Sequence, residues 1–396
     1  MTVYVVSTTG SNANGTGSLA SPWATFAYAS NLIAAGDLLY VRGGTYDEAM
    51  LNRFPSGIDA NHKTRIVGYP GDSVPVIAPS TATSANWALR VTTKSDQSYE
   101  GLKLDGLEVN IDTVKLTDTA SRIDLIGCTV TNAPLQGVLM TGTGSGHLLR
   151  NCTIHGNGLT YADEVSQLHN VYCSVPDVTI EDCTIYGALD PGGYGIHAYG
   201  GDPSRLIVRR CKVYSNQYGI GIFTGSDMRV ENCITWGNSA AGLRMAYGAA
   251  SARAWHNTIL DGFYNGGSPT SNCELVNNII WPVRAHITDT GSVATALRSN
   301  LIVSITDAGS GTVTEGNVLD TDPVFVDQGG NDYRIRPTSP AAWKGRVVPE
   351  VTTDYLGKPR PTGALMPSIG AYEPTVAASG GRPFGRPGRP IPRARR

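Results

Sequence analysis

The segments NCTIHGN (151–157), DCTIYG (182–187), RCKVYSN (210–216) and NCITWGN (232–238) are variants of one pattern. Each places a cysteine second, before a short run that suits a β-strand and a Gly or Ser that suits a turn. GCTVTN (127–132) precedes them, and HNTILDG (256–262), NNIIW (277–281) and SNLIV (299–303) continue the pattern with Asn instead of Cys. The aligned positions lie 24, 31, 28, 22, 24, 21 and 22 residues apart, at Cys128, Cys152, Cys183, Cys211, Cys233, Asn257, Asn278 and Asn300. Each interval corresponds to one coil of a repeat.

A repeat of this length, built from short strands without helices between them, predicts an all-β, single-stranded parallel β-helix. Leucine ladders, which would favour a leucine-rich repeat, are absent from the sequence. Equivalent residues of successive coils stack about 4.8 Å apart in such a solenoid. Five of the seven cysteines then form one ladder, and an asparagine ladder follows. Because no CxxC spacing occurs, we expect buried apolar thiols and no metal site.

Both ends of the chain suit the caps that a solenoid needs. SPWATFAYASNLI (21–33) has apolar residues at helical spacing after a Ser-Pro start, which predicts a short N-terminal capping helix. GDLLYVRGGTY (36–46) then supplies the first strand after the helix.

The sequence resembles right-handed parallel β-helix proteins of the pectate-lyase superfamily. The resemblance lies in STTGSNANGTGSLASPWATFAYA (7–29) with AGDLLYVRGGTY (35–46), and in the closing segment from Asp320 to Glu373. It implies a right-handed coil and a C-terminal cap. It also implies a range of activities, because the superfamily contains polysaccharide lyases, glycoside hydrolases, epimerases and bacteriophage tailspikes.

We therefore divide the chain into four parts. These are an N-terminal cap with the first strands (1–64), β-helix coils (65–317), a C-terminal capping extension (318–374) and a flexible Arg/Pro/Gly tail (375–396).

The charge distribution bears on the partners. The chain has 31 Lys and Arg against 33 Asp and Glu, but six of the arginines lie in the tail, so the remainder carries a net charge of −8. An acidic body disfavours nucleic-acid binding. No apolar run is long enough to span a membrane, and the N-terminus lacks the pattern of a signal peptide.

A second strand lies upstream of each Cys or Asn strand, and its alternation assigns residues to faces. Val138, Val171, Ile196, Ile220 and Leu243 are predicted to point inward. The residues between the inward positions are predicted to face solvent in three columns: Leu139, Tyr172, His197, Gly221 and Arg244; Gln136, His169, Tyr194, Tyr218 and Ala241; and Thr141, Ser174, Tyr199, Phe223 and Ala246. Gly221, between a histidine and an arginine, is expected to leave a hollow of the size of a sugar ring.

This patch is the candidate site. We expect His197, Tyr172 and Arg244 to be catalytic, because imidazole and phenol groups transfer protons and a guanidinium can neutralise a carboxylate. The expected substrate-binding residues are the other aromatic members of the patch and carboxylates of the two longest coils: His169, Tyr194, Tyr199, Tyr218, Phe223, Asp163, Glu164 and Asp190. Those carboxylates could instead form a hydrolase pair, bind an occasional calcium ion or simply form turns. No calcium motif occurs, so we expect no cofactor.

Two classes of function remain open. The first is an enzyme that binds a polysaccharide and cleaves it, with β-elimination favoured over hydrolysis. The second is a non-enzymatic phage tail or surface adhesin that binds glycans, with a homotrimer or virion partner possible. Either would be extracellular or virion-associated.

Overall fold

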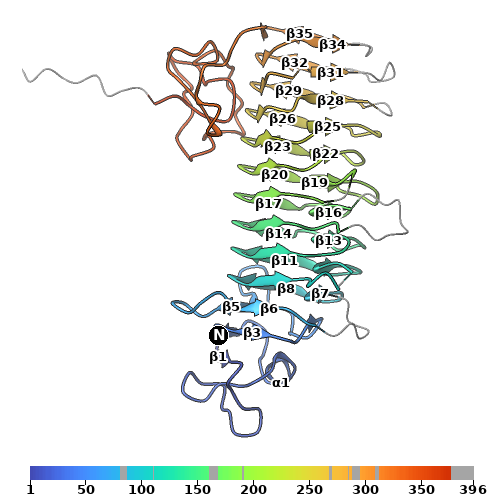
Figure 1. The fold of residues 1–396 in the computed structure, drawn as a ribbon, viewed down its shortest axis with the longest axis vertical. Helices are drawn as coiled ribbons and strands as arrows, with labels where there is room; N and C mark the ends of the chain where they lie inside the picture. Colours follow the sequence, from blue (N-terminus) through green and yellow to red (C-terminus); the bar gives the residue numbers. More distant parts are fainter. Residues whose placement is uncertain are drawn as a thin grey trace, which may run out of the picture.

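The computed structural model describes residues 1–80, 87–109, 111–159, 168–189, 191–266, 270–283, 285–287, 295–307 and 312–375. Within them the chain winds through three parallel β-sheets that run the length of an elongated solenoid (Figure 1). One five-residue helix, α1 (Phe26–Ser30), lies at the N-terminal end. The predicted all-β parallel β-helix with a short N-terminal capping helix is confirmed.

The 13-stranded sheet contains, in spatial order, β1 (Val3–Val6), β2 (Leu38–Val41), β5 (Thr64–Gly68), β8 (Ser95–Glu100), β11 (Ser121–Ile126), β14 (Leu148–Arg150), β17 (Thr179–Glu181), β20 (Ile207–Arg209), β23 (Arg229–Glu231), β26 (Arg253–Trp255), β29 (Glu274–Val276), β32 (Ala296–Arg298) and β35 (Val313–Glu315). The 12-stranded sheet contains β3 (Thr45–Tyr46), β6 (Val76–Ile77), β9 (Lys103–Asp105), β12 (Thr129–Thr131), β15 (Thr153–His155), β18 (Thr184–Tyr186), β21 (Lys212–Tyr214), β24 (Ile234–Trp236), β27 (Thr258–Ile259), β30 (Ile279–Ile280), β33 (Leu301–Ile302) and β36 (Val318–Leu319). The 11-stranded sheet contains β4 (Met50–Leu51), β7 (Leu89–Val91), β10 (Val114–Leu116), β13 (Val138–Met140), β16 (Val171–Cys173), β19 (Tyr194–Ala198), β22 (Tyr218–Ile222), β25 (Ala241–Met245), β28 (Phe263–Asn265), β31 (Ala285–Ile287) and β34 (Ile305–Asp307).

The turn between the 13-stranded and the 12-stranded sheet explains the sequence repeat. Its first residue has a positive φ in successive coils, for example 54° at Asn151, 56° at Asp182 and 55° at Asn232. Asn and Asp tolerate this left-handed conformation, which turns the chain sharply into the next strand. The Cys or Asn of the repeat comes directly after it.

Both predicted ladders are present. The repeat cysteines are buried and free, and their neighbouring strands β12, β15, β18, β21 and β24 pair in order. The asparagines then hydrogen-bond from coil to coil, with Asn257 Nδ2 donating to Asn278 Oδ1 and Asn278 Nδ2 donating to Asn300 Oδ1, each at 2.9 Å. The asparagine ladder gives the buried polar turn the hydrogen-bond partners that it needs.

The N-terminal cap closes one end of the core. At helix α1, the Thr25 hydroxyl accepts a hydrogen bond from the Tyr28 amide, and the Glu48 carboxylate accepts from the Phe26 and Ala27 amides. These bonds satisfy donors that a short helix leaves unpaired at its start. The four domain boundaries of the sequence interpretation stay a prediction, and β1 and β2 already belong to the 13-stranded sheet.

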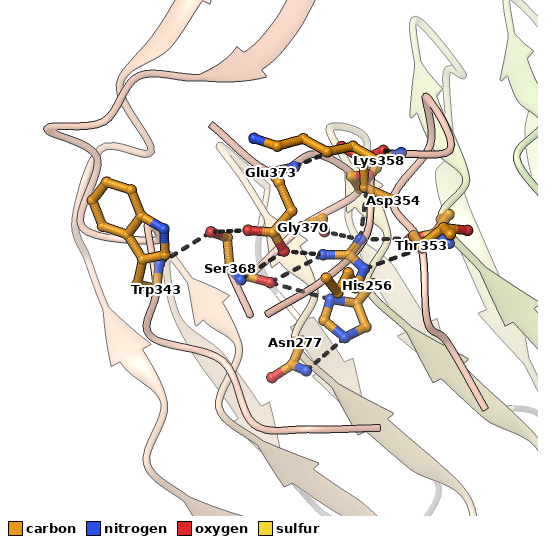
Figure 2. Close-up of polar contacts among 12 residues, drawn as sticks. His256, Asn277, Trp343, Thr353, Asp354, Lys358, Ser368, Gly370 and Glu373 are labelled. Carbon is orange, nitrogen blue, oxygen red and sulfur yellow. Dashed lines mark hydrogen bonds and ion pairs between the residues drawn. The ribbon is translucent and has the colours of Figure 1, made fainter. Parts of the chain in front are cut away.

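The C-terminal extension lies beside the last coils (Figure 1) and contains the antiparallel pair β37 (Phe325–Asp327) and β38 (Asp332–Ile335). The buried Arg360 guanidinium donates to the Glu373 carboxylate at 2.7 Å and to Asn232 Oδ1, in a coil turn, at 2.6 Å. Figure 2 shows the buried His256 ring between Ser368 of the extension and Asn277 of the next coil turn. Polar groups without solvent access thus fix the extension to the coils.

Candidate active site

The candidate site is on the outer face of the 11-stranded sheet, over β16, β19, β22, β25 and β28. Parallel pairing sets Tyr172 opposite His197, His197 opposite Gly221, and Gly221 opposite Arg244. The column predicted from the repeat is therefore present in the expected register. The inward positions Val138, Val171, Ile196, Ile220 and Leu243 are buried in the core, as predicted.

The columns do not face solvent as expected. Tyr194 and Phe223 are 1% exposed and His197 is 5% exposed, whereas Tyr199 is 41% exposed. The physical reason is that the aromatic side chains fold over the sheet and bury one another. The Tyr194 and His197 rings stack at 4.6 Å, and Phe223 meets both edge-on, at 5.6 Å from Tyr194 and 5.0 Å from His197. The patch is a compact aromatic cluster with one exposed rim.

The predicted role of Gly221 is wrong. A Cβ atom at this position would lie 2.7 Å from the Tyr194 ring and 2.8 Å from the Phe223 ring. The space beside Gly221 is therefore filled by these two rings, and glycine is needed so that they can approach the sheet.

The hollow lies further out. It has a volume of about 230 Å³ and is lined by Tyr194, His197, Tyr199, Phe223, Arg244 and Tyr247. A second hollow, of about 290 Å³, shares Arg244 and is also lined by Tyr218 and Tyr264. Because the two hollows share a wall, the surface offers a short groove beside one arginine, with aromatic side chains on both sides.

Arg244 is held by aromatic rings. Its guanidinium carbon lies 5.1 to 5.6 Å from the ring centres of Tyr218, Phe223, Tyr247 and Tyr264. Its Nη1 donates to the Tyr194 hydroxyl at 2.9 Å, while its buried Nε has no hydrogen-bond partner in the described part of the chain. No carboxylate among the described residues forms an ion pair with it. The positive charge of Arg244 is thus positioned but not neutralised.

His197 is a neutral imidazole at physiological pH. Burial, together with the Arg244 guanidinium, lowers the pKa of His197 to about 3. Its Nδ1 atom is buried and has no hydrogen-bond partner among the residues described. His197 can accept or donate one proton through its neutral form, but it cannot serve as an imidazolium acid at neutral pH.

The structure separates the other predicted residues by depth. His169 is buried, and its Nδ1 accepts a hydrogen bond from the Tyr194 amide at 3.0 Å, so it supports the β19 strand. Tyr172 is half-buried, with its ring 5.4 Å from that of His197, and it does not line the hollow. Asp163, Glu164 and Asp190 lie outside the described residues.

Sequence reasoning missed Tyr247 and Tyr264. Tyr264 is paired with Arg244 in the next strand, β28, so extending the aligned column by one coil would have found it. Tyr247 has a positive φ of 49° in the turn after β25, and no periodic signal marks it.

Other kinds of site find no support in the described part of the chain. It contains no group of three or more His, Cys, Asp or Glu placed to hold a metal ion. Nor does it contain a helix with the length and apolar character of a membrane span.

Residues 136–304 match the family model described as a right handed beta helix region. No curated protein has a significant match to this sequence. Among solved structures, the pectate lyase Pel9A is 14% identical with a TM-score of 0.65, over 95% of this chain and 97% of that one. XylC, solved with xylose, is 10% identical with a TM-score of 0.63, over 94% and 99%. A rhamnogalacturonan lyase is 14% identical with a TM-score of 0.60, over 91% and 99%. These identities establish a shared fold, and the resemblance noted from the sequence is confirmed at that level. The chain is a right-handed parallel β-helix protein.

Proposed function

We propose that this protein binds an acidic polysaccharide on the outer face of the 11-stranded sheet and cleaves it by β-elimination. The observation that carries the proposal is Arg244, a partly buried guanidinium that meets four aromatic rings and no carboxylate in the described chain. A cation in this setting favours an incoming anion, because the surrounding low dielectric strengthens the attraction. A uronate carboxylate has the shape and charge to form bidentate hydrogen bonds with a guanidinium.

The aromatic rim supplies the second half of sugar recognition. Tyr199 and Tyr247 are each 41% exposed beside the hollow, so their rings are open to an apolar sugar face. Stacking on an aromatic side chain positions a sugar ring whether or not the sugar carries a charge. The fold is shared with lyases and other proteins that act on carbohydrates or were solved with them, which is consistent with a sugar polymer as the ligand.

The chemistry follows from the neighbouring charges. Arg244 neutralises the carboxylate, so the carbon next to it can lose its proton to His197. The released electron pair forms a carbon–carbon double bond, the glycosidic carbon–oxygen bond breaks, the leaving oxygen takes a proton from water, and His197 returns its proton to the solvent. Burial is the main cause of the lowered pKa of His197, and the Arg244 charge adds to it, so a bound carboxylate that offsets the arginine charge would raise the basicity of the imidazole. Tyr172, the third predicted catalytic residue, lies beside His197 on the neighbouring strand and does not line the hollow, so it would act through His197 rather than on the substrate.

Purified protein incubated with a panel of acidic and neutral polysaccharides tests the proposal. Absorbance from unsaturated products, together with new reducing ends, is expected with a uronate polymer. Reducing ends without the absorbance would show a hydrolase. Binding without either product would support a glycan adhesin, and with it the virion partner or homotrimer that this class suggests. In all three cases the protein would act outside the cell or on a virion.

A further inference from the structure

A third hollow, of about 490 Å³, lies on a different sheet from the two beside Arg244. It is lined by residues of three successive coils on the 13-stranded sheet and by one residue of the C-terminal extension: Arg205, Ile207, Asp227, Arg229, Arg253, Trp255 and Glu350. Its volume falls within the range of small-molecule sites. It shares no residue with the groove beside Arg244.

The parallel register builds this hollow. Ile207 of β20 lies opposite Arg229 of β23, which lies opposite Arg253 of β26. Trp255 follows two residues after Arg253 on the same face, and the Arg253 guanidinium carbon is 5.8 Å from the indole centre. Trp255 is 5% exposed because it packs with Val276, Val348 and Val351, so the open surface here is formed by the partly exposed Ile207 and the two guanidinium groups.

The three arginines differ in their partners. Arg205 is neutralised by Asp177, to which its Nε and Nη2 donate hydrogen bonds at 2.5 and 2.8 Å. Arg253 is 3.6 Å from the Asp227 carboxylate. Within the described chain, the side chain of Arg229 forms neither an ion pair nor a hydrogen bond. Its donors lie beside the hollow and have no acceptor among the residues that the structure describes.

Acceptors without a strong partner lie in the same place. The Asp227 side chain is 56% exposed, and Glu350 is an exposed residue of the extension. Next to Arg229 on the same face, Glu231 is 5% exposed, and its Oε2 has no hydrogen-bond partner in the described residues. Burial raises the pKa of Glu231. Because Arg205 is paired with Asp177, the remaining charges that line this hollow are two arginines, Arg229 and Arg253, and two carboxylates, Asp227 and Glu350, in contrast to the groove beside Arg244.

We infer that this hollow is a second carbohydrate site that binds a neutral sugar unit. A sugar ring presents vicinal hydroxyls, which donate to carboxylates and accept from a guanidinium, and an apolar face that can pack against the partly exposed Ile207 side chain. The balanced charges disfavour an anionic ligand, since Asp227 and Glu350 would repel it. The inference holds whether or not the groove on the 11-stranded sheet cleaves its substrate.

Ligand-observed NMR with the methyl glycosides of glucose, galactose, mannose and xylose tests this site. Methyl glucuronide and inorganic sulfate serve as the anionic probes. We expect at least one neutral glycoside to bind with a Kd on the order of millimolar, as suits a ligand of this size. Arg229→Ala and Asp227→Asn should each weaken that binding about tenfold or more. Arg205→Ala, which removes an arginine already held by Asp177, should change it less than about twofold.

The same measurements can overturn the inference. Binding of sulfate or glucuronide alone that is lost in Arg229→Ala and kept in Arg244→Ala would show an anion site in this hollow, and no binding by any neutral glycoside would show no sugar site. Binding that survives Arg229→Ala would place the sugar elsewhere. Because Arg229 lines this hollow and not the groove beside Arg244, loss of neutral-sugar binding in Arg229→Ala separates this site from the proposed cleavage site. Thermal unfolding of each variant confirms that the fold is intact.

Discussion

Arginines on two faces of the same solenoid have different surroundings. On the 13-stranded sheet, Arg150 and Arg209 both donate to the Glu181 carboxylate, at 2.5 Å each, so the neighbouring coil supplies a counter-ion. On the 11-stranded sheet, the neighbouring coils of Arg244 supply Gly221 and Tyr264 instead. The same parallel register therefore gives the arginines two different kinds of neighbour. Where a carboxylate faces an arginine, the two form an ion pair, and where rings face it, as at Arg244, the charge has no counter-ion in the described chain, which is why we propose that a ligand carboxylate supplies one.

Among the substitutions that test this comparison, the one at His197 is expected to have the largest effect. His197→Ala should reduce polysaccharide cleavage by about 10²- to 10⁴-fold, because it removes the proton-transferring group beside Arg244. Steady-state turnover and thermal unfolding, measured on the same preparations, test this. Unchanged turnover would remove His197 from the mechanism.

A substitution at Gly221, in the sheet beneath the aromatic cluster, should disrupt the packing of the cluster. Gly221→Ala places a methyl group within 3 Å of the Tyr194 and Phe223 rings, and should lower the free energy of unfolding by about 1–3 kcal/mol. Gly363→Ala is the matched control, because a Cβ atom there meets nothing within 4 Å. Urea denaturation compares the two. Equal stabilities would mean that the rings move away without cost.

Acid should weaken the attachment of the C-terminal extension. Burial lowers the pKa of His256 well below its usual value, and Arg360 adds to the effect. The unfolded state therefore binds a proton at a higher pH than the folded state does. Stability from this group is complete above about pH 6.5 and falls below it, by about 1.4 kcal/mol per pH unit.

The groups around His256 do little to stabilise its protonated form. Its Nε2 faces the Asn277 amide nitrogen, and Asn277 is itself fixed by the backbone of Arg346. Arg360 and Glu373 are already paired with each other. Chemical denaturation between pH 5 and 8 measures the slope. His256→Asn, compared over the same range, should flatten it, and an unchanged slope would assign the loss to the other buried histidines.

The smallest effect is expected in the ion-pair ladder. Arg209→Ala removes one of three arginines that contact Glu181, and its side chain is 36% exposed, so the loss of stability should be below about 1 kcal/mol. Cleavage should be unchanged, since Arg209 is on the other sheet. A large loss of activity would show that the two faces are coupled.

The coil architecture and the register of the site column were predictable because they follow from spacing alone. Aligning the repeat cysteines was enough to place His197 between Tyr172 and Gly221. The burial of the column was not predictable, because it depends on how Tyr194 and Phe223 turn over the sheet. The buried ion pair of Arg360 with Glu373 could not be predicted either, because the C-terminal extension has no repeat from which to infer its partners.

The most direct test of the central claim is the affinity of Arg244 for an acidic sugar. An acidic oligosaccharide and its carboxyl-reduced, neutral form are titrated into the parent protein and into Arg244→Ala. If Arg244 neutralises a substrate carboxylate, the parent binds the acidic form at least about tenfold more tightly, and Arg244→Ala loses this preference while keeping its affinity for the neutral form. An equal loss of affinity for both forms, or no loss for either, would contradict the account.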